Sequence, residues 1–185
     1  MRELTTKLSG PRLFELDRFS DERGTFMEAW HHDRFAALGI TDRWVQDNHS
    51  TSRRGVLRGL HFQVDPGQAK LVRVALGRAF DVVVDVRRAS SGFGQWDAFE
   101  LVTEPPRVLY VPPGFAHGFC ALDDETHLLY KVSVLYDASR ERGLAWNDPD
   151  VGIEWPVANP ILSPRDRSLP GLGELIPADR ADAER

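Results

Sequence analysis

The sequence predicts a single all-β domain of the jelly-roll or small-barrel type. Short runs rich in β-branched and aromatic residues recur along the chain, each bounded by Gly, Pro or Asp, and this spacing is typical of sandwiches and barrels. Helical periodicity is scarce, and turn sequences such as Pro112-Pro113-Gly114 separate the runs. At 185 residues the chain can bury one sizeable core but is short for two. We therefore expect residues 1–185 to form one domain.

The expected elements follow from local periodicity. A short helix is expected at residues 33–38, with Asp33 as its N-cap and Gly39 at its end. In the segment 79–86 apolar and polar residues alternate, which predicts a strand with one buried face. Further strands are expected at Lys70–Leu76, Arg107–Val111 and His127–Val134, and a turn near Ala138–Arg142. Residues 178–185 are small and charged, which predicts a frayed tail.

Charge and composition exclude several classes of function. The chain has 23 Lys+Arg against 28 Asp+Glu, a net charge of -5, so nothing favours general attraction to nucleic acid or an anionic membrane. No apolar run approaches the length of a membrane span, and the N-terminus lacks the apolar core of a signal peptide. Cys120 is the single cysteine, so no internal disulfide can form. These features predict a cytoplasmic protein that binds neither nucleic acid nor membrane.

Three motifs keep the frame of the cupins, a jelly-roll class in which such motifs supply metal ligands: Gly55-x5-His61, Lys70-x6-Gly77 and Pro112-x-Gly114-x2-His117. Gln63, Lys70 and Ala121 stand where the second His, the Glu and the Asn of that frame would stand. Two imidazoles are too few for a typical Zn or Fe site, and an ammonium in place of a carboxylate repels a cation. We therefore expect no metal and no cofactor.

A histidine and a lysine in the mouth of a barrel suit the removal of a proton next to a ketone. Such a C–H becomes acidic when a fixed positive charge meets the developing enolate. His61 is the candidate base, and Lys70 is the candidate enolate stabiliser. Inversion of the carbon needs a second acid–base group on the opposite face of the sugar. Tyr130 is the candidate for that group.

Several separate motifs resemble, in the same order, the dTDP-4-dehydrorhamnose 3,5-epimerase family. They are Gln46-Asp47-Asn48, Arg58-Gly59-Leu60-His61-Phe62-Gln63, Gln68-Ala69-Lys70-Leu71, Pro112-Pro113-Gly114-Phe115-Ala116-His117-Gly118-Phe119, Tyr130-Lys131, Tyr136, Trp146-Asn147-Asp148-Pro149, Trp155-Pro156 and Ser163-Pro164-Arg165-Asp166. The resemblance covers nearly the whole chain, from Asp21 to Pro170. It implies a cupin-type jelly roll, a homodimer, and metal-independent inversion of C3 and C5 of a dTDP-4-keto-6-deoxyhexose through an enolate, in the rhamnose pathway.

The resemblance also implies roles for individual residues. His61 is the implied base, Asp166 the carboxylate that orients its imidazole, Lys70 the enolate stabiliser and Tyr130 the acid. A carboxylate behind a histidine favours one tautomer and stabilises the imidazolium. Around the nucleotide the implied residues are Arg23, Glu28, Gln46, Asp47, Asn48, Arg58, His117, Glu141 and Arg165, with Tyr136 stacked on the base. Arginine matches phosphate oxygens in a fork, and an aromatic face supports base stacking.

Three alternatives share parts of this pattern. An enzyme that inverts only C3 or only C5, in a pathway to an antibiotic sugar, would need the same catalytic set. A 3,4-ketoisomerase of the same fold is disfavoured by the long epimerase motif set. A non-catalytic nucleotide-sugar binding module is disfavoured because His61, Lys70, Tyr130 and Asp166 are all present. Uptake of solvent deuterium by the substrate separates an enzyme from a binding module.

Overall fold

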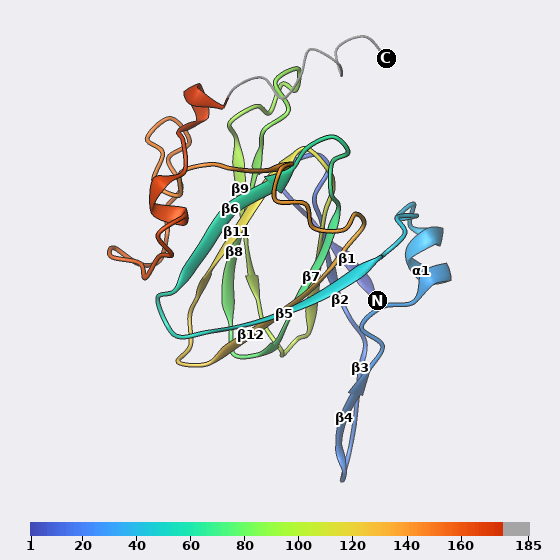
Figure 1. Ribbon diagram of the computed structural model, residues 1–185. Helices are drawn as coiled ribbons and strands as arrows, with labels where there is room; N and C mark the ends of the chain where they lie inside the picture. Colours follow the sequence, from blue (N-terminus) through green and yellow to red (C-terminus); the bar gives the residue numbers. More distant parts are fainter. Residues whose placement is uncertain (176–185) are drawn as a thin grey trace.

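A computed structural model describes residues 1–175 as a barrel of two antiparallel sheets (Figure 1). The predicted tail at 178–185 lies outside the described residues. One sheet has six strands, in the order β1 (Arg2–Leu4), β2 (Arg12–Glu15), β10 (Arg107–Val111), β7 (Lys70–Leu76), β12 (Thr126–Val132) and β5 (Gln46–Ser52). The other has five strands, in the order β13 (Glu141–Gly143), β6 (Leu57–Gln63), β11 (Phe115–Ala121), β8 (Ala79–Asp85) and β9 (Trp96–Leu101). The predicted jelly-roll architecture is confirmed.

The remaining elements lie outside the two sheets. The hairpin of β3 (Arg18–Asp21) and β4 (Gly24–Met27) projects away from the barrel beside helix α1 (His32–Ala37) (Figure 1). Two short 3-10 helices, η1 (Asp166–Ser168) and η2 (Leu172–Glu174), lie in the C-terminal segment.

Three apolar clusters organise the layers, because side chains alternate between the two faces of every strand. Between the sheets, inward residues such as Val72, Val83 and Leu128 form the central core. The outer face of the six-stranded sheet packs against the segment that contains α1, through Phe14, Phe35, Leu71 and neighbours. The outer face of the five-stranded sheet packs against the C-terminal segment, through Leu60, Val82, Leu144, Leu172 and neighbours. The space between the sheets is therefore shielded from both sides.

The predicted strands are confirmed, and β7 and β10 have the expected bounds. The predicted cap of the helix is wrong. The N-cap of α1 is His31, which makes no side-chain cap bond, and Asp33 lies in the first turn, where a carboxylate still interacts favourably with the helix dipole. Gly39, at φ 83°, follows the helix end as expected. Within residues 1–175 no helix is long and apolar enough to cross a membrane.

The expectation of one exposed face on β8 is wrong, because β8 is buried on both faces. Asp81 is 0% exposed and Asp85 is 2% exposed. The strand lies between β11 and β9, with its inner face in the barrel and its outer face under the C-terminal segment. Both carboxylates are hydrogen-bonded, as buried polar groups require. Asp81 binds His117, and Asp85 binds Arg87 and other groups. The alternation in the sequence therefore reflects two different buried environments, the inside of the barrel and the layer under the C-terminal segment.

A bulge in β6 changes which side chains enter the barrel. On β11, His117 pairs with His61 and Phe119 pairs with Arg58, so β6 contains one residue more than β11 over this interval. Gly59 lies in the bulge at φ 124°, and a Cβ there would stand 2.7 Å from the Cα of Gly118. The position favours glycine on both counts. As a result Arg58 and His61, three residues apart, line the same pocket.

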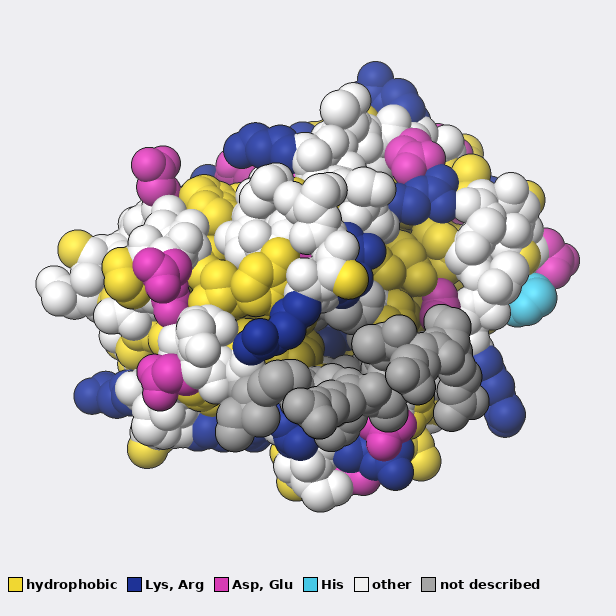
Figure 2. All heavy atoms as spheres, turned by 90° about the horizontal axis from the view of Figure 1, so that it is seen from above, with side chains coloured by type: hydrophobic (Ala, Val, Ile, Leu, Met, Phe, Trp, Pro, Cys, Tyr) yellow, Lys and Arg dark blue, Asp and Glu magenta, His cyan; other side chains and the backbone are white. Residues whose placement is uncertain are grey.

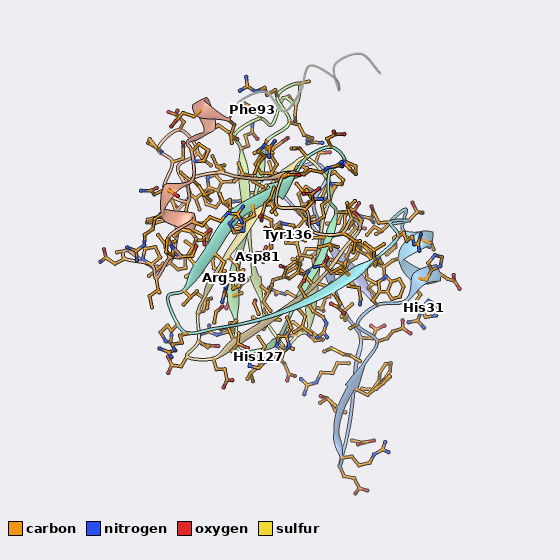
Figure 3. All side chains as sticks on the ribbon, viewed as in Figure 1. His31, Arg58, Asp81, Phe93, His127 and Tyr136 are labelled. Atoms are coloured by element: carbon orange, nitrogen blue, oxygen red, sulfur yellow. The ribbon has the colours of Figure 1, made fainter. Side chains whose placement is uncertain are left out.

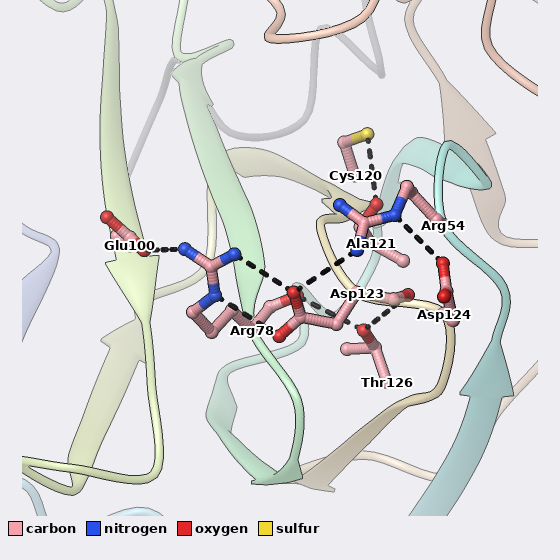
Figure 4. A network of polar contacts seen from close by, with 8 residues as sticks. All are labelled: Arg54, Arg78, Glu100, Cys120, Ala121, Asp123, Asp124 and Thr126. Carbon is pink, nitrogen blue, oxygen red and sulfur yellow. Dashed lines mark hydrogen bonds and ion pairs between the residues drawn. The ribbon is translucent and has the colours of Figure 1, made fainter.

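An ion-pair network ties loops at one end of β12 (Figure 4). Arg78 binds Asp123 at 2.9 Å and Glu100 at 3.2 Å, while Arg54 binds Asp124 at 2.9 Å. The hydrogen bond from Arg78 lowers the pKa of Asp123. Apart from Asp123, these side chains are about half exposed or more, and exposed pairs of this kind contribute little stability. We assign the network no role in the chemistry.

Candidate active site

A pocket of about 270 Å³ lies between the two sheets. It gathers side chains from both sheets and from the C-terminal segment: Ser50, Arg58, His61, Lys70, His117, Phe119, Leu128, Tyr130, Ser163, Arg165 and Asp166, with the backbone of Gly118. In Figure 3 the labelled Arg58, Asp81 and Tyr136 lie within the outline of the barrel, whereas His31 lies beside α1. The lining of the pocket includes all four residues predicted to be catalytic, which are His61, Lys70, Tyr130 and Asp166.

His61 and Asp166 form a hydrogen-bonded pair. His61 Nε2 donates to Asp166 Oδ1 at 2.7 Å, and Asp166 belongs to η1, 105 residues further along the chain. Burial disfavours ionisation of Asp166, but the hydrogen bond and charge of His61, helped by Ser163 and the backbone of Gly59, hold its pKa below the usual value. With Nε2 engaged by a carboxylate, Nδ1 is the nitrogen of His61 available to take a proton.

Lys70 is buried at the start of β7 and donates to the backbone oxygen of His61 at 3.0 Å. Burial lowers its pKa to about 8, while the charges of Glu141 and Asp81 oppose the shift. The ammonium is thus charged at neutral pH yet poorly solvated, a state in which its interaction with a nearby anion is strong.

A second buried pair stands beside the first. His117 Nε2 donates to both oxygens of Asp81, at 2.9 and 3.0 Å. Burial raises the pKa of Asp81, against the opposing effects of His117 and Lys70. The two histidines face each other in register across β6 and β11. Each of the two imidazoles of the cupin frame is therefore committed to its own carboxylate.

Tyr130 belongs to β12, in the sheet opposite His61. Burial raises its pKa, helped by Glu141 and opposed by Arg58, so its phenol stays protonated around neutral pH. Arg58 is held by Ser52 Oγ at 3.0 Å and by the backbone oxygen of Thr51 at 3.2 Å. The pocket thus offers a base on one side and a protonated acid on the other.

A second set of predicted residues includes Arg165, which lines the pocket, and residues connected to it by hydrogen bonds or lying on β5. Arg165 Nη1 lies 2.6 Å from Glu141 Oε2, and hydrogen bonding to Glu141 and Tyr136 raises the pKa of Arg165. Gln46 and Asn48 lie on the inner face of β5 and bind each other at 2.8 Å. Gln46 also accepts the backbone N–H of Tyr136 at 3.1 Å.

Three other predicted ligand residues bind partners away from this pocket. Arg23 is at the turn of the β3–β4 hairpin and binds Asp21. Glu28 binds Arg34 at 3.1 Å. Asp47 lies on the outer face of β5, where it binds Lys131 at 2.9 Å. Within one chain, the structure does not bring these three residues together with His61.

Sequence reasoning missed Ser50 and Ser163, which line the pocket, and Asp81, which binds the pocket residue His117. Asp81 looked like the exposed side of an alternating strand, and only the fold turns it toward His117. Ser163, which accepts the backbone N–H of Asp166 at 3.0 Å, was part of a motif but had no assigned role. Ser50 lies two residues after Asn48 on the inner face of β5. A period-two reading of the polar strand could have found Ser50.

Figure 2 shows one face of the molecule, on which hydrophobic side chains are exposed beside Lys and Arg side chains. Tyr136, which is hydrogen-bonded to the pocket residue Arg165, and its neighbour Leu135 are exposed apolar residues. Such a mixture of aromatic and cationic groups suits a ligand with a base and phosphates.

Comparisons with known proteins agree with this chemistry. The model of the dTDP-4-dehydrorhamnose 3,5-epimerase family matches residues 5–174. The dTDP-4-dehydrorhamnose 3,5-epimerase of Shigella flexneri is 48% identical over 168 residues, which cover 90% of this chain and 93% of the relative. A dTDP-4-dehydrorhamnose 3-epimerase of Streptomyces niveus is 46% identical and covers 84% of this chain and 76% of its own.

A solved structure extends the comparison to three dimensions. The dTDP-6-deoxy-D-glucose-3,5-epimerase of Legionella pneumophila, crystallised with dTDP-4-keto-L-rhamnose, matches with a TM-score of 0.92 and 40% identity. The match covers 95% of this chain and 94% of the other. On sequence and fold alike, the chain belongs to the dTDP-4-dehydrorhamnose 3,5-epimerase family.

Proposed function

We propose that the protein inverts C3 and C5 of a dTDP-4-keto-6-deoxyhexose, as in the rhamnose pathway. The observation that carries the proposal is the arrangement of the His61–Asp166 pair and Tyr130 on opposite sheets, with the buried ammonium of Lys70 in the same pocket. The relatives named above act on or bind dTDP-sugars of this class, which supports the choice of substrate.

The mechanism moves one proton at a time. His61 takes the proton from the carbon next to the ketone, and Asp166 stabilises the imidazolium. The electron pair of the C–H bond passes to the ketone oxygen, where the charge of Lys70 stabilises the enolate. Tyr130 then protonates the same carbon from the other face. The imidazolium of His61 releases its proton to solvent and the tyrosinate of Tyr130 takes one from solvent, so both groups return to their starting states. Repetition at the second carbon completes the double inversion.

The nucleotide is held by the other predicted residues. In this proposal Arg58, His117 and Arg165 approach the phosphates and sugar from the pocket wall, while Glu141, Gln46 and Asn48 contribute polar contacts near the mouth. Tyr136, 54% exposed, stacks on the base. Exposure in the free protein is what a stacking platform requires.

Solvent-deuterium uptake is the experiment that tests the function. The protein is mixed with the 4-keto-6-deoxy sugar nucleotide in heavy water, and deuterium at C3 and C5 is followed by NMR. We expect exchange at both carbons. Binding of the nucleotide sugar without exchange at either carbon would instead assign the chain to the binding modules.

A second candidate function is inversion at C3 alone. The 46% identity to a dTDP-4-dehydrorhamnose 3-epimerase favours it, and the catalytic pocket would be the same. The heavy-water experiment distinguishes the two enzymes, because a C3 epimerase leaves C5 unlabelled over many turnovers.

The pH dependence of kcat/KM should report the deprotonation of Lys70. Because burial lowers the pKa of Lys70 to about 8, the ammonium that stabilises the enolate is lost as the pH rises through that value. We expect kcat/KM of the free enzyme to fall above pH about 8. In Lys70→Arg, whose charge persists at alkaline pH, residual activity should lack this decline. An unchanged alkaline limb in the variant would assign the limb to another group.

Activity should not depend on a divalent ion. Among residues 1–175 no group of three His, Cys, Asp or Glu is placed to hold a metal, and both pocket imidazoles are paired with carboxylates. Exhaustive chelation should therefore leave kcat/KM unchanged. Loss of activity on chelation, with recovery on adding one divalent ion, would contradict the mechanism.

We further propose a homodimer in which the β3–β4 hairpin serves the pocket of the other copy. The hairpin projects from the barrel (Figure 1) and exposes Phe19 and Phe26, so it has apolar surface to bury against a partner. Arg23 at its turn can approach a nucleotide only if that nucleotide is bound by another copy, because it lies outside the pocket of its own chain.

Complementation tests the shared site. Arg23→Glu and His61→Ala homodimers should both be impaired, the first mainly in KM. A mixed dimer has one site with an intact His61 and an intact arm, so co-refolding equal amounts should restore about a quarter of the wild-type sites. No restoration, despite mixed dimers seen by mass spectrometry, would exclude the shared site. A monomer in sedimentation would exclude the dimer itself.

The proposal places the enzyme in the cytoplasm, without nucleic-acid or membrane partners. Cys120 is buried and the described residues contain no disulfide, which suits a reducing compartment. The net charge of -5 leaves phosphate recognition to local arginines.

A further inference from the structure

The loop that carries Tyr136 follows directly after β12 and lies at the surface. Leu135 is 63% exposed and Tyr136 is 54% exposed, and the strand ladder ends at Val132. Exposed loops without ladder bonds are usually mobile. The backbone of this loop is nevertheless hydrogen-bonded, and its partners are side chains rather than a neighbouring strand.

Three glutamine side chains bind four consecutive residues of the loop. Gln68 Nε2 donates to the backbone oxygen of Val134 at 2.7 Å. Gln63 Nε2 donates to the backbone oxygen of Leu135 at 3.3 Å, and Gln63 Oε1 accepts the N–H of Asp137 at 3.1 Å. Gln46 Oε1 accepts the N–H of Tyr136 at 3.1 Å. We call these three side chains the glutamine clasp.

Gln63 is the centre of the clasp. Its side chain is buried in the barrel, with the residue 5% exposed, and its amide brackets Tyr136 by binding the residues before and after it. An amide suits this arrangement, because it carries a donor and an acceptor side by side. A glutamate has no donor for Leu135, and a histidine cannot span both groups.

The clasp also accounts for the departure from the cupin frame. Gln63 stands where the second metal-binding histidine of the frame would stand. In this structure the amide of Gln63 binds the backbone of the Tyr136 loop instead of a metal ion. The residue that removes a metal ligand is therefore the residue that holds the loop.

We propose that Gln63, with Gln46 and Gln68, is a positioning residue that fixes Tyr136 as a preformed platform for the nucleotide base. The inference rests on the proposed function, in which Tyr136 stacks on that base. Because the loop is already ordered in the folded protein, ligand binding does not have to bear the entropy cost of ordering it. Nucleotide affinity is therefore gained without a further contact. It follows that Gln63 acts on nucleotide affinity without touching the ligand.

Gln63→Met tests the inference, because it keeps the length of the side chain and removes both hydrogen bonds. The freed loop groups can be hydrated, since the loop is exposed, so the barrel should stay folded. We expect the Kd for dTDP and the KM for the sugar nucleotide to rise about tenfold, with kcat within about twofold of wild type. Gln95→Met is the matched control, because the exposed side chain of Gln95 donates to the backbone oxygen of Ser91 within its own loop, and it should leave both constants unchanged.

A double-mutant cycle identifies the route of the effect. If Gln63 acts through Tyr136, then Gln63→Met should weaken dTDP binding in the wild-type background and have almost no effect in the Tyr136→Ala background. A general loosening of the barrel would instead weaken binding equally in both backgrounds, and that additive result would overturn the inference.

Amide exchange in the free protein separates this inference from the proposed function. In Gln63→Met the N–H of Asp137 should exchange faster, while amides of β8 keep their protection. Unchanged exchange at Asp137 would overturn the clasp whatever the enzyme does. Faster exchange with unweakened dTDP binding would overturn only the positioning role. A wild-type protein that binds no dTDP would overturn the proposed function itself.

Discussion

His61→Ala should reduce deuterium exchange at C3 and C5 by a factor of about 10²–10⁴, the usual cost of losing a positioned general base. Asp166 would lose its partner, and no other imidazole can replace His61, because His117 is held by Asp81. The backbone oxygen that receives the Lys70 hydrogen bond remains, so Lys70 should stay in place. Exchange rates from NMR, at saturating substrate, measure the loss.

His127→Ala is the matched control for this substitution. His127 lies on the outer side of β12, hydrogen-bonded to His49 and Glu125, and is not part of the pocket. We expect wild-type exchange in this variant. Exchange in His61→Ala at more than a tenth of the wild-type rate, with the fold intact by circular dichroism, would reject His61 as the base.

Tyr130→Phe should separate exchange from inversion. The base and Lys70 are untouched, so the enolate still forms, and His61 can return deuterium to the face from which the proton left. Configuration is then retained. Because the phenylalanine keeps the ring and removes only the donor, we expect inversion to fall by about 10²–10⁴ and exchange with retention to persist. Product stereochemistry by NMR, beside total deuterium content, gives both rates.

Tyr110→Phe provides the comparison for the hydroxyl deletion. Tyr110 donates to Asp42 at 2.9 Å on the outer side of the six-stranded sheet, away from the pocket, and this variant should invert the sugar normally. If Tyr130→Phe also inverts at the wild-type rate, a water molecule or another side chain must deliver the second proton, and Tyr130 only shapes the pocket.

Runs rich in β-branched and aromatic residues predicted β7, β8, β10 and β12, whereas β5, β6 and β11, which lack such a run, were missed. β5 reads Gln-Asp-Asn-His-Ser-Thr-Ser, with polar residues on both faces, because one face borders the ligand pocket and the other the surface. β6 and β11 each have one glycine, Gly59 and Gly118, where their backbones approach each other. In these strands the sequence is shaped by the site rather than by the core, and apolar alternation is absent.

The candidate site was predicted by motif resemblance for the residues that meet within one chain. His61, Lys70, Tyr130 and Asp166 come from four separate segments, and no local pattern could have shown that they converge. Arg23, Glu28 and Asp47 are a different case, because their places depend on a hairpin direction and on the face of an edge strand. Local sequence determines neither, since both follow from how elements dock.

The extra residue in β6 makes the pocket sensitive to chain length as well as to chemistry. A strand shows its side chains to alternate sides, so removing one residue between Arg58 and His61 would reverse the orientation of everything beyond the deletion. His61 and Gln63 would then point into the layer now filled by Leu60 and Phe62, and the base and the loop anchor would be lost together. An evolving or redesigned relative can exchange side chains here one at a time, whereas a change of even a single residue in spacing would have to be compensated along the whole strand.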